Sequence, residues 1–220
     1  MATENTMQHP PGAVLHSPML YDAIVWLAMG GRERRLRRRL LDLSGLRPGE
    51  SVIDVGCGTG TLAILAKKNT GEAGKVFGVD ASPEMLARAR SKAVRAGIDV
   101  SFELAAAQAL PFADFSFDLA LSTMMLHHLG RVARRELAAE LRRVIRPGGR
   151  ALVVDFARHA GKSGGWRAHF RHRHGHVDPA EIVALLEGAG FRPVASGAVG
   201  IMNMHFALAA APETQVASSR

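Results

Sequence analysis

Short apolar stretches alternate with longer amphipathic ones between about residue 45 and residue 210. The apolar stretches predict β-strands at 51–55, 75–80, 100–104, 116–122, 151–156, 192–197 and 201–209. Between them, apolar residues three and four positions apart predict helices at 61–68, 83–96 and 131–145, and another after Asp178. Two more helices are expected earlier, at 19–29 and between Gly31 and Ser44. Strands that alternate with helices in this way predict an α/β fold with a mostly parallel sheet covered on both faces.

Capping residues sharpen several of these boundaries. Ser82 is a good N-cap, Pro83 suits the first helical turn, and the Glu84 carboxylate favours the positive end of the helix dipole. Gly97 is expected to end that helix. The helix at 131–145 is expected to stop at a turn over residues 146–149, before the next strand.

The composition places the chain among soluble globular proteins. Its 220 residues, 47% hydrophobic and 22% charged, suit one domain with terminal appendages. The N-terminus lacks a secretion signal pattern, and no run of 18 apolar residues occurs. The single cysteine, Cys57, excludes an intramolecular disulfide and fits a reducing compartment. We therefore expect a cytoplasmic location.

The charge is strongly positive and unevenly spread. The formal net charge is +8, and six arginines fall between positions 32 and 39. Such an excess suits an anionic partner, which could be a nucleic acid, a membrane surface or a small substrate. A solvated helix face would explain the arginine run equally well.

A glycine-rich loop, VIDVGCGTG at residues 52–60, follows the first predicted strand. Its spacing is one residue short of the dinucleotide fingerprint, and no lysine follows as a phosphate-binding loop would need. Asp54, just before the glycines, suits a cationic amine better than a second anion. Asp80 ends the next strand, where a carboxylate can accept both hydroxyls of a ribose. An amine and a ribose together describe S-adenosylmethionine.

Four motifs in order resemble class I S-adenosylmethionine-dependent methyltransferases, most closely the group related to the ubiquinone/menaquinone C-methyltransferases (methyltransferase type 11). They are VIDVGCGTG, FGVDASPEML, ALPFADFSFDLALSTMMLHHL and LRRVIRPGGRALVVDF. The resemblance implies a Rossmann-like fold, with a seven-stranded, mostly parallel sheet, an antiparallel terminal strand and helices on both faces. It also implies three parts: an N-terminal arm and helical cap (1–44), the methyltransferase domain (45–212) and a C-terminal tail (213–220).

The resemblance also assigns cofactor contacts. It implies that Asp54 and the backbone of Gly56, Cys57 and Gly58 face the methionine portion, with Asp80 on the ribose. The remaining contacts that it implies are Ala81 and Met85 at the adenine, Ser122 beneath the sulfonium and Tyr21 near the methionine carboxylate. Relatives commonly have an aspartate after the third strand where this chain has Ala106. The adenine is then expected to rely on the backbone of Ala106 and Ala107 or on Gln108.

Histidines after the fourth strand are candidates for catalysis. His127 or His128 could act as a general base, with Asp155 as a further candidate. In the competing structural interpretation, one histidine packs beneath the next helix and the other caps it. The expected acceptor pocket comprises Trp26, Met124, Met125, His127, Trp166 and Met202. In the histidine-rich segment 159–176 the arginines disfavour a metal, so a basic lid is expected there and no metal site.

The predicted function is methyl transfer from S-adenosylmethionine to a small, partly hydrophobic molecule through a carbon, oxygen or nitrogen nucleophile. A quinone-like or lipid-like acceptor would fit. The alternatives are a nucleic-acid methyltransferase, for which an N-P-P-Y type loop and a recognition domain are missing, and a cofactor-binding module without turnover. No nucleic-acid partner is expected. Peripheral contact with an anionic membrane and the oligomeric state, for which a homodimer is one option, stay open.

Overall fold

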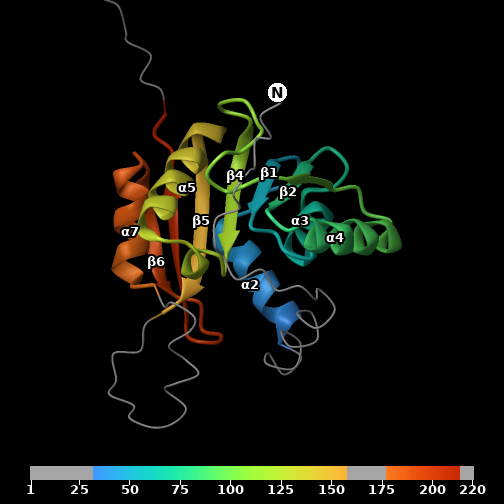
Figure 1. Cartoon of the computed structure of the whole chain (residues 1–220), viewed down its shortest axis with the longest axis horizontal. Helices are drawn as coiled ribbons and strands as arrows, with labels where there is room; N and C mark the ends of the chain where they lie inside the picture. The colour runs from blue at the N-terminus through green and yellow to red at the C-terminus, as the bar shows by residue number, and fades with distance from the viewer. Residues whose placement is uncertain (1–31, 158–176, 214–220) are drawn as a thin grey trace, which may run out of the picture.

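The computed structural model describes residues 32–157 and 177–213, and these form a seven-stranded sheet with the order β3-β2-β1-β4-β5-β7-β6 (Figure 1). Every neighbouring pair from β3 to β5 is parallel, while β7 runs antiparallel to both β5 and β6. The strands are β1 (Ser51–Val55), β2 (Lys75–Asp80), β3 (Ser101–Leu104), β4 (Phe117–Thr123), β5 (Ile145–Phe156), β6 (Arg192–Ala198) and β7 (Met204–Ala210).

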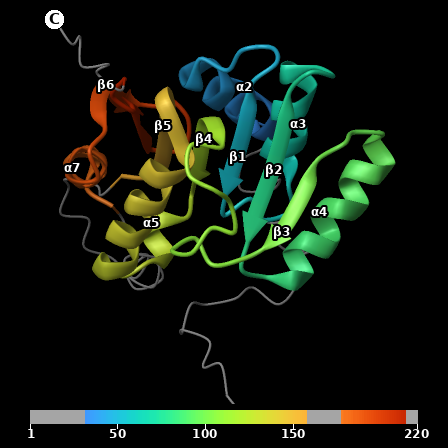
Figure 2. The ribbon, with the colours of Figure 1, turned by 90° about the horizontal axis from the view of Figure 1, so that it is seen from above.

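Helices cover both faces of this sheet, as Figure 2 shows for α2 and α3 on one side and α5 and α7 on the other. Leucines and alanines of α2, α3 and α4 pack with one face of the central strands, and those of α5 and α7 pack with the other face. The helices are α2 (Glu33–Ser44), α3 (Thr61–Thr70), α4 (Pro83–Ala96), the short 3-10 helix η1 (Leu126–His128), α5 (Arg131–Val144) and α7 (Pro179–Gly188).

The predicted fold class is confirmed, and most boundaries agree within a few residues. The Ser82 hydroxyl accepts from the Met85 N–H at 3.2 Å, and Gly97 ends α4 in the left-handed region, as the sequence predicts. Two boundaries were wrong. The segment 146–149 belongs to β5, because Ile145 already pairs with Phe117 before a register shift. β7 begins at Met204, because residues 201–203 form the turn that precedes it.

The strand order fixes where a ligand can bind. The chain runs from β1 outward through β2 and β3, and then returns to the other side of β1 as β4. In such a sheet a crevice opens at the carboxyl ends of the strands where the order reverses. The loops after β1, β2, β3 and β4 therefore meet at this edge. The β6–β7 turn joins them there, because Met204 pairs with Phe156 at the end of β5.

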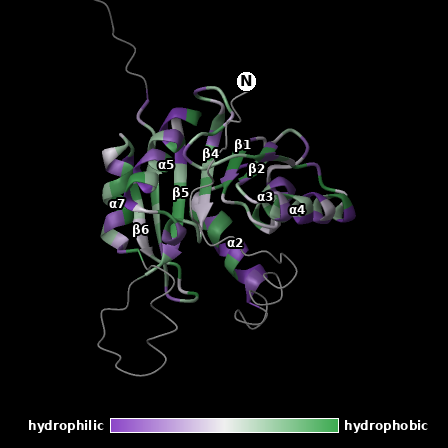
Figure 3. Ribbon diagram, in the orientation of Figure 1, coloured by the Kyte–Doolittle hydropathy of each residue, from purple (hydrophilic) through white to green (hydrophobic). Residues whose placement is uncertain are grey.

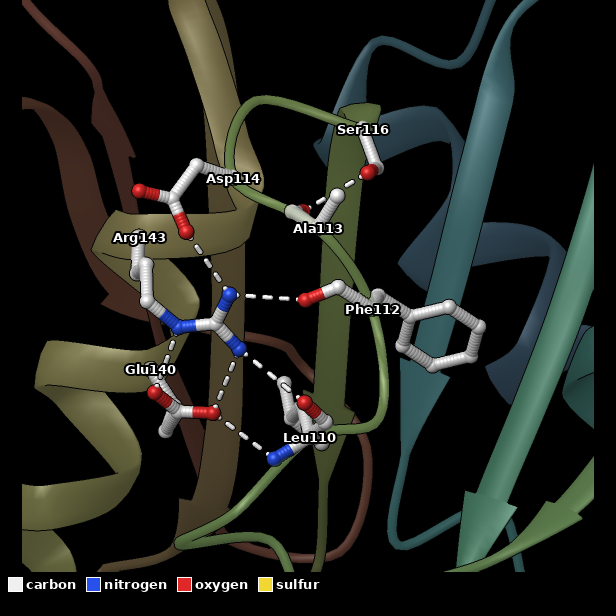
Figure 4. A network of polar contacts seen from close by, with 7 residues as sticks. All are labelled: Leu110, Phe112, Ala113, Asp114, Ser116, Glu140 and Arg143. Atoms are coloured by element: carbon white, nitrogen blue, oxygen red, sulfur yellow. Dashed lines mark hydrogen bonds and ion pairs between the residues drawn. The ribbon is translucent and has the colours of Figure 1, made fainter.

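A charged clamp holds the loop between β3 and β4 against α5 (Figure 4). The Arg143 guanidinium donates to the carbonyls of Leu110 (3.0 Å) and Phe112 (2.7 Å) and pairs with Asp114 and Glu140. Glu140 also accepts from the Leu110 N–H at 2.7 Å. The hydrogen bonds from Arg143 lower the pKa of Glu140, and those to Glu140 and Asp114 raise the pKa of Arg143. The clamp fixes the loop on which residues 106–108 lie.

Hydropathy follows the layers of the fold. Figure 3 shows apolar residues along the central strands and hydrophilic residues on the outer surfaces of the helices, including the first turns of α2. Within residues 32–157 and 177–213, no helix combines the length and the apolar character needed to cross a membrane.

Candidate cofactor and acceptor site

The three glycines of the loop after β1 have different neighbours. All three have positive φ, +75° at Gly56, +54° at Gly58 and +73° at Gly60, which favours glycine. A Cβ on Gly56 would lie 2.6 Å from a Met125 side-chain carbon, and one on Gly60 would lie 2.8 Å from Phe102. A Cβ on Gly58 would meet no described atom within 4 Å. Gly56 and Gly60 therefore permit close packing, while Gly58 borders open space that a ligand can occupy.

Asp80 ties this loop to the start of α4. One carboxylate oxygen accepts from the Gly58 N–H at 2.8 Å, and the other accepts from the Ser82 N–H at 2.9 Å. Asp80 thus takes the position that the sequence predicts beside the loop and also orients two backbone turns. Each oxygen has a further lone pair, so both can still accept from the hydroxyls of a ribose.

Asp54 is a buried carboxylate without a hydrogen-bond partner among the described residues. Its side chain is 1% exposed, and neither oxygen lies in hydrogen-bonding geometry with a described donor. The pKa of Asp54 is raised to about 7, chiefly by burial and also by the Asp80 carboxylate, while Arg37 and the Ala63 N–H oppose the rise. Because a buried carboxylate without a partner is costly, its oxygens favour a cationic ligand. Ser122 resembles it, since its hydroxyl is also buried without a partner among the described residues.

The other cofactor residues predicted from the sequence surround the same edge. Cys57 turns its side chain inward, where its Sγ would lie 2.9 Å from a Cβ on Gly78, and burial raises the pKa of its thiol. The thiol therefore stays protonated and only the backbone can serve a ligand. Met85 is buried, whereas Ala81 is exposed. The loop 106–108 starts beside Asp80, whose carbonyl accepts from Ala105.

The chain turns sharply where β4 ends. Met124 has a positive φ of +56°, which is strained for a residue with a side chain. This conformation directs the chain into η1, and Met125 then packs over Gly56. Met124 packs against the α2–α3–α4 side of the core and Met125 against the α5–α7 side. Of the two predicted pocket methionines, Met125 therefore lies directly against the glycine loop.

His127 forms a buried pair with Asp155. Its Nδ1 lies 2.7 Å from Asp155 Oδ1, and its backbone N–H donates to Oδ2 at 3.1 Å. Asp155 is completely buried, and only 8% of the His127 side chain is exposed. A carboxylate at Nδ1 selects the tautomer with its proton on Nδ1, which leaves Nε2 as an acceptor. The sequence offered His127 and Asp155 as separate candidates, and the fold joins them because η1 lies against the end of β5.

The structural interpretation of the histidines is wrong in one respect. The N-cap of helix α5 is Gly130 and no side chain caps the helix, so neither histidine has that role. His128 is exposed, and its ring centroid lies 4.0 Å from that of His127.

Several predicted residues cannot be placed at this site. Tyr21, Trp26, Trp166 and the histidine-rich segment lie outside the described residues. Met202 lies in the turn before β7, at the same edge of the sheet, and is exposed. Within the described ranges, no group of three metal-binding side chains occurs.

These features fit S-adenosylmethionine. Open space borders Gly58, the carboxylate of Asp80 accepts from its N–H, and the buried Asp54 carboxylate before the loop has no hydrogen-bond partner among the described residues. The residues that would hold the cofactor are Asp54, Gly58 and Asp80, with residues 106–108 at the adenine.

Comparisons with known sequences agree with this interpretation. Residues 52–149 match the model of a methyltransferase domain. The ubiquinone/menaquinone biosynthesis C-methyltransferase UbiE of Cupriavidus necator is 30% identical over 197 residues, which cover 79% of this chain and 80% of that protein. The demethylmenaquinone methyltransferase of Thermus thermophilus is 38% identical over 62% of this chain and 60% of its own. The chain spans about half the length of other curated relatives, such as 56% of the Cupriavidus taiwanensis UbiE.

Solved structures share the fold. A SAM dependent methyltransferase from Aquifex aeolicus superposes with a TM-score of 0.70 at 23% identity, over 88% of this chain and 98% of that one. The [4+2]-cyclase SpnF superposes with a TM-score of 0.71 at 19% identity, over 81% of each chain. At such identities the likeness concerns the fold alone, and the second example shows that this fold is not restricted to proteins named methyltransferases.

Proposed function

Because the chain belongs to the S-adenosylmethionine-dependent methyltransferases of the UbiE family, we propose that it methylates a small, partly hydrophobic acceptor with a quinone-like ring. The names of the relatives, which specify ubiquinone, menaquinone and demethylmenaquinone, support this acceptor class. When bound, S-adenosylmethionine supplies an electrophilic methyl group on a sulfonium. The residues of this chain must then orient the acceptor, exclude water and remove a proton.

The observation that carries the proposal is the His127–Asp155 pair. A hydroxylated aromatic ring becomes a strong carbon or oxygen nucleophile when its hydroxyl loses a proton. His127 Nε2 can take that proton, while Asp155 holds the ring in place and stabilises the imidazolium that results. Met124 and Met125 provide adaptable apolar surface beside the base, which suits a hydrophobic ring.

Methyl transfer to a reduced, water-soluble naphthoquinone lacking the ring methyl group would test this proposal. Purified protein with S-adenosylmethionine should give a product heavier by one methyl group. His127→Asn and Asp155→Asn should lower kcat by about 100-fold to 10,000-fold, the range that a general base contributes. Unchanged pH–rate profiles in both variants would contradict the role of the pair.

Two other functions give different results in the same assay. Methylation of RNA or DNA, but not of the ring compound, would favour a nucleic-acid methyltransferase. Cofactor binding without turnover on either would favour a binding module.

We also propose that the acceptor is reached from an anionic membrane surface. Five of the six arginines between positions 32 and 39 are exposed, four of them on α2 and Arg32 at its N-cap, while Leu36 and Leu40 of the same helix are buried. A basic helix face attracts anionic lipids, in which a quinone-like acceptor would dissolve.

A further inference from the structure

One arginine of the α2 run differs from the other five. Arg37 is only 9% exposed, whereas the other five, Arg32, Arg34, Arg35, Arg38 and Arg39, are exposed to solvent. A buried arginine is seldom left without charged partners, because taking its charge out of water is expensive. We therefore expect the buried Arg37 guanidinium to have negatively charged partners.

Glu33 is one such partner, but it uses only some of the N–H donors of Arg37. Arg37 Nε and Nη2 both donate to the same oxygen, Glu33 Oε1, at 3.0 and 2.9 Å. A guanidinium has five N–H donors in a fixed planar fork, so this contact uses two of them and fixes the direction of the others. Glu33 is the more exposed partner, with 21% of its side chain accessible against 11% for Arg37. The carboxylate thus holds the guanidinium from its outer side.

The other neighbouring carboxylate is Asp54, which directly precedes the glycine loop. Arg37 is the cation whose charge acts on Asp54, yet the two do not form a hydrogen bond. α2 passes behind the sheet, and its first turns extend beyond the arrowhead of β4, at the ligand edge (Figure 1). A buried carboxylate and a buried guanidinium therefore lie near one another without closing into a pair.

A zwitterion satisfies both groups at once. An α-ammonium can donate to Asp54 while the α-carboxylate of the same molecule accepts from Arg37. We propose that Arg37 binds the carboxylate of the methionine portion of the cofactor, opposite Asp54 on the ammonium. This inference rests on the proposed function for the identity of the cofactor. It assigns the methionine carboxylate to one arginine within the run at positions 32–39.

The test compares two ligands that differ in one group. Calorimetric titration would measure S-adenosylmethionine, which carries the carboxylate, and decarboxylated S-adenosylmethionine, which lacks only that group and keeps the ammonium and the sulfonium. Arg37→Gln should weaken the first by about 10-fold to 100-fold, the usual effect of losing a hydrogen bond to a charged group, and leave the second within about 2-fold. Arg37→Lys should recover part of the loss. Arg38→Gln, an exposed neighbour on the same helix, is the matched control and should change neither affinity.

The outcomes separate this proposal from the proposed function. Equal weakening of both ligands, or no weakening of either, would overturn the role of Arg37 while wild-type binding still supports the cofactor site. Absence of wild-type binding to both ligands would overturn the cofactor site and this proposal together. If Arg37→Gln does not fold, Glu33→Gln provides a second test. It releases the guanidinium and should selectively weaken the binding of the carboxylate-bearing ligand.

Discussion

Replacing Asp54 with asparagine should stabilise the ligand-free protein at alkaline pH. Burial raises the pKa of this carboxyl to about 7 from its usual 3.8, so the folded chain keeps a proton that the unfolded chain has lost. A group with a raised folded-state pKa stabilises the fold fully below its unfolded pKa, and that stability is lost as the pH rises toward the folded pKa. The loss therefore occurs between about pH 4 and pH 7, and a difference of about three pKa units corresponds to roughly 4 kcal/mol.

Asparagine removes this charge but not the burial of polar atoms. A buried amide without partners costs about 1–3 kcal/mol. The net gain of Asp54→Asn should be about 1–3 kcal/mol at pH 8 and close to zero at pH 5, where the wild-type carboxyl is mostly protonated. For a chain of this size, each kcal/mol moves the melting temperature by about 2–4 °C.

Thermal melts by circular dichroism between pH 5 and pH 8.5 would measure this difference. Asp42→Asn, a change at an exposed aspartate of α2, is the control and should give a wild-type profile. S-adenosylmethionine should raise the melting temperature of the wild type and leave Asp54→Asn unmoved. A melting difference that is the same at pH 5 and pH 8 would refute the idea that Asp54 is forced to ionise inside the fold.

Three further predictions concern the loop, the clamp and α2. Gly60→Ala should cost roughly 2–4 kcal/mol in chemical denaturation, from its positive φ and from contact with α4 and β3. Gly58→Ala should cost less, about 1–2 kcal/mol, yet lose cofactor affinity in calorimetry; the reverse order would contradict the different roles of the two glycines. Arg143→Met should lower stability by about 2–3 kcal/mol, because it breaks the clamp on the β3–β4 loop, and a smaller loss than 0.5 kcal/mol would show the clamp to be dispensable. Arg38→Glu with Arg39→Glu should abolish binding to anionic vesicles at low salt in sedimentation, and binding that survives would exclude this face of α2 as the contact.

Local patterns were sufficient for most of the fold. Apolar runs identified the strands, and the caps Ser82 and Gly97 marked both ends of α4, because such signals act within one turn of the chain. The start of β5 was missed because Pro147 and Gly148 are typical of turns, whereas the pairing of Ile145 with Phe117 depends on a strand 28 residues earlier.

The contacts within the site were harder to predict from the sequence than the fold. Loops after parallel strands could be brought to one edge by topology alone, which placed Asp54 and Asp80 near each other. The His127–Asp155 bond could not be derived, because it depends on how η1 folds back over the end of β5. The burial of Arg37 could not be distinguished within a run of arginines. Leu40 and Leu41, three and four positions after Arg37, share its side of α2, which is the side that faces inward.

The position of β7 bears on the order in which the site assembles. β5 pairs with β7 along seven residue pairs, from Arg150 with Ala210 to Phe156 with Met204, so its outer edge stays open until a much later part of the chain has been synthesised. Strands β1 to β4, with Asp54, Gly58 and Asp80, depend on no segment beyond β5 for their pairing. During translation the cofactor half of the crevice can therefore form first, and the strand that carries Asp155 gains its second neighbour last.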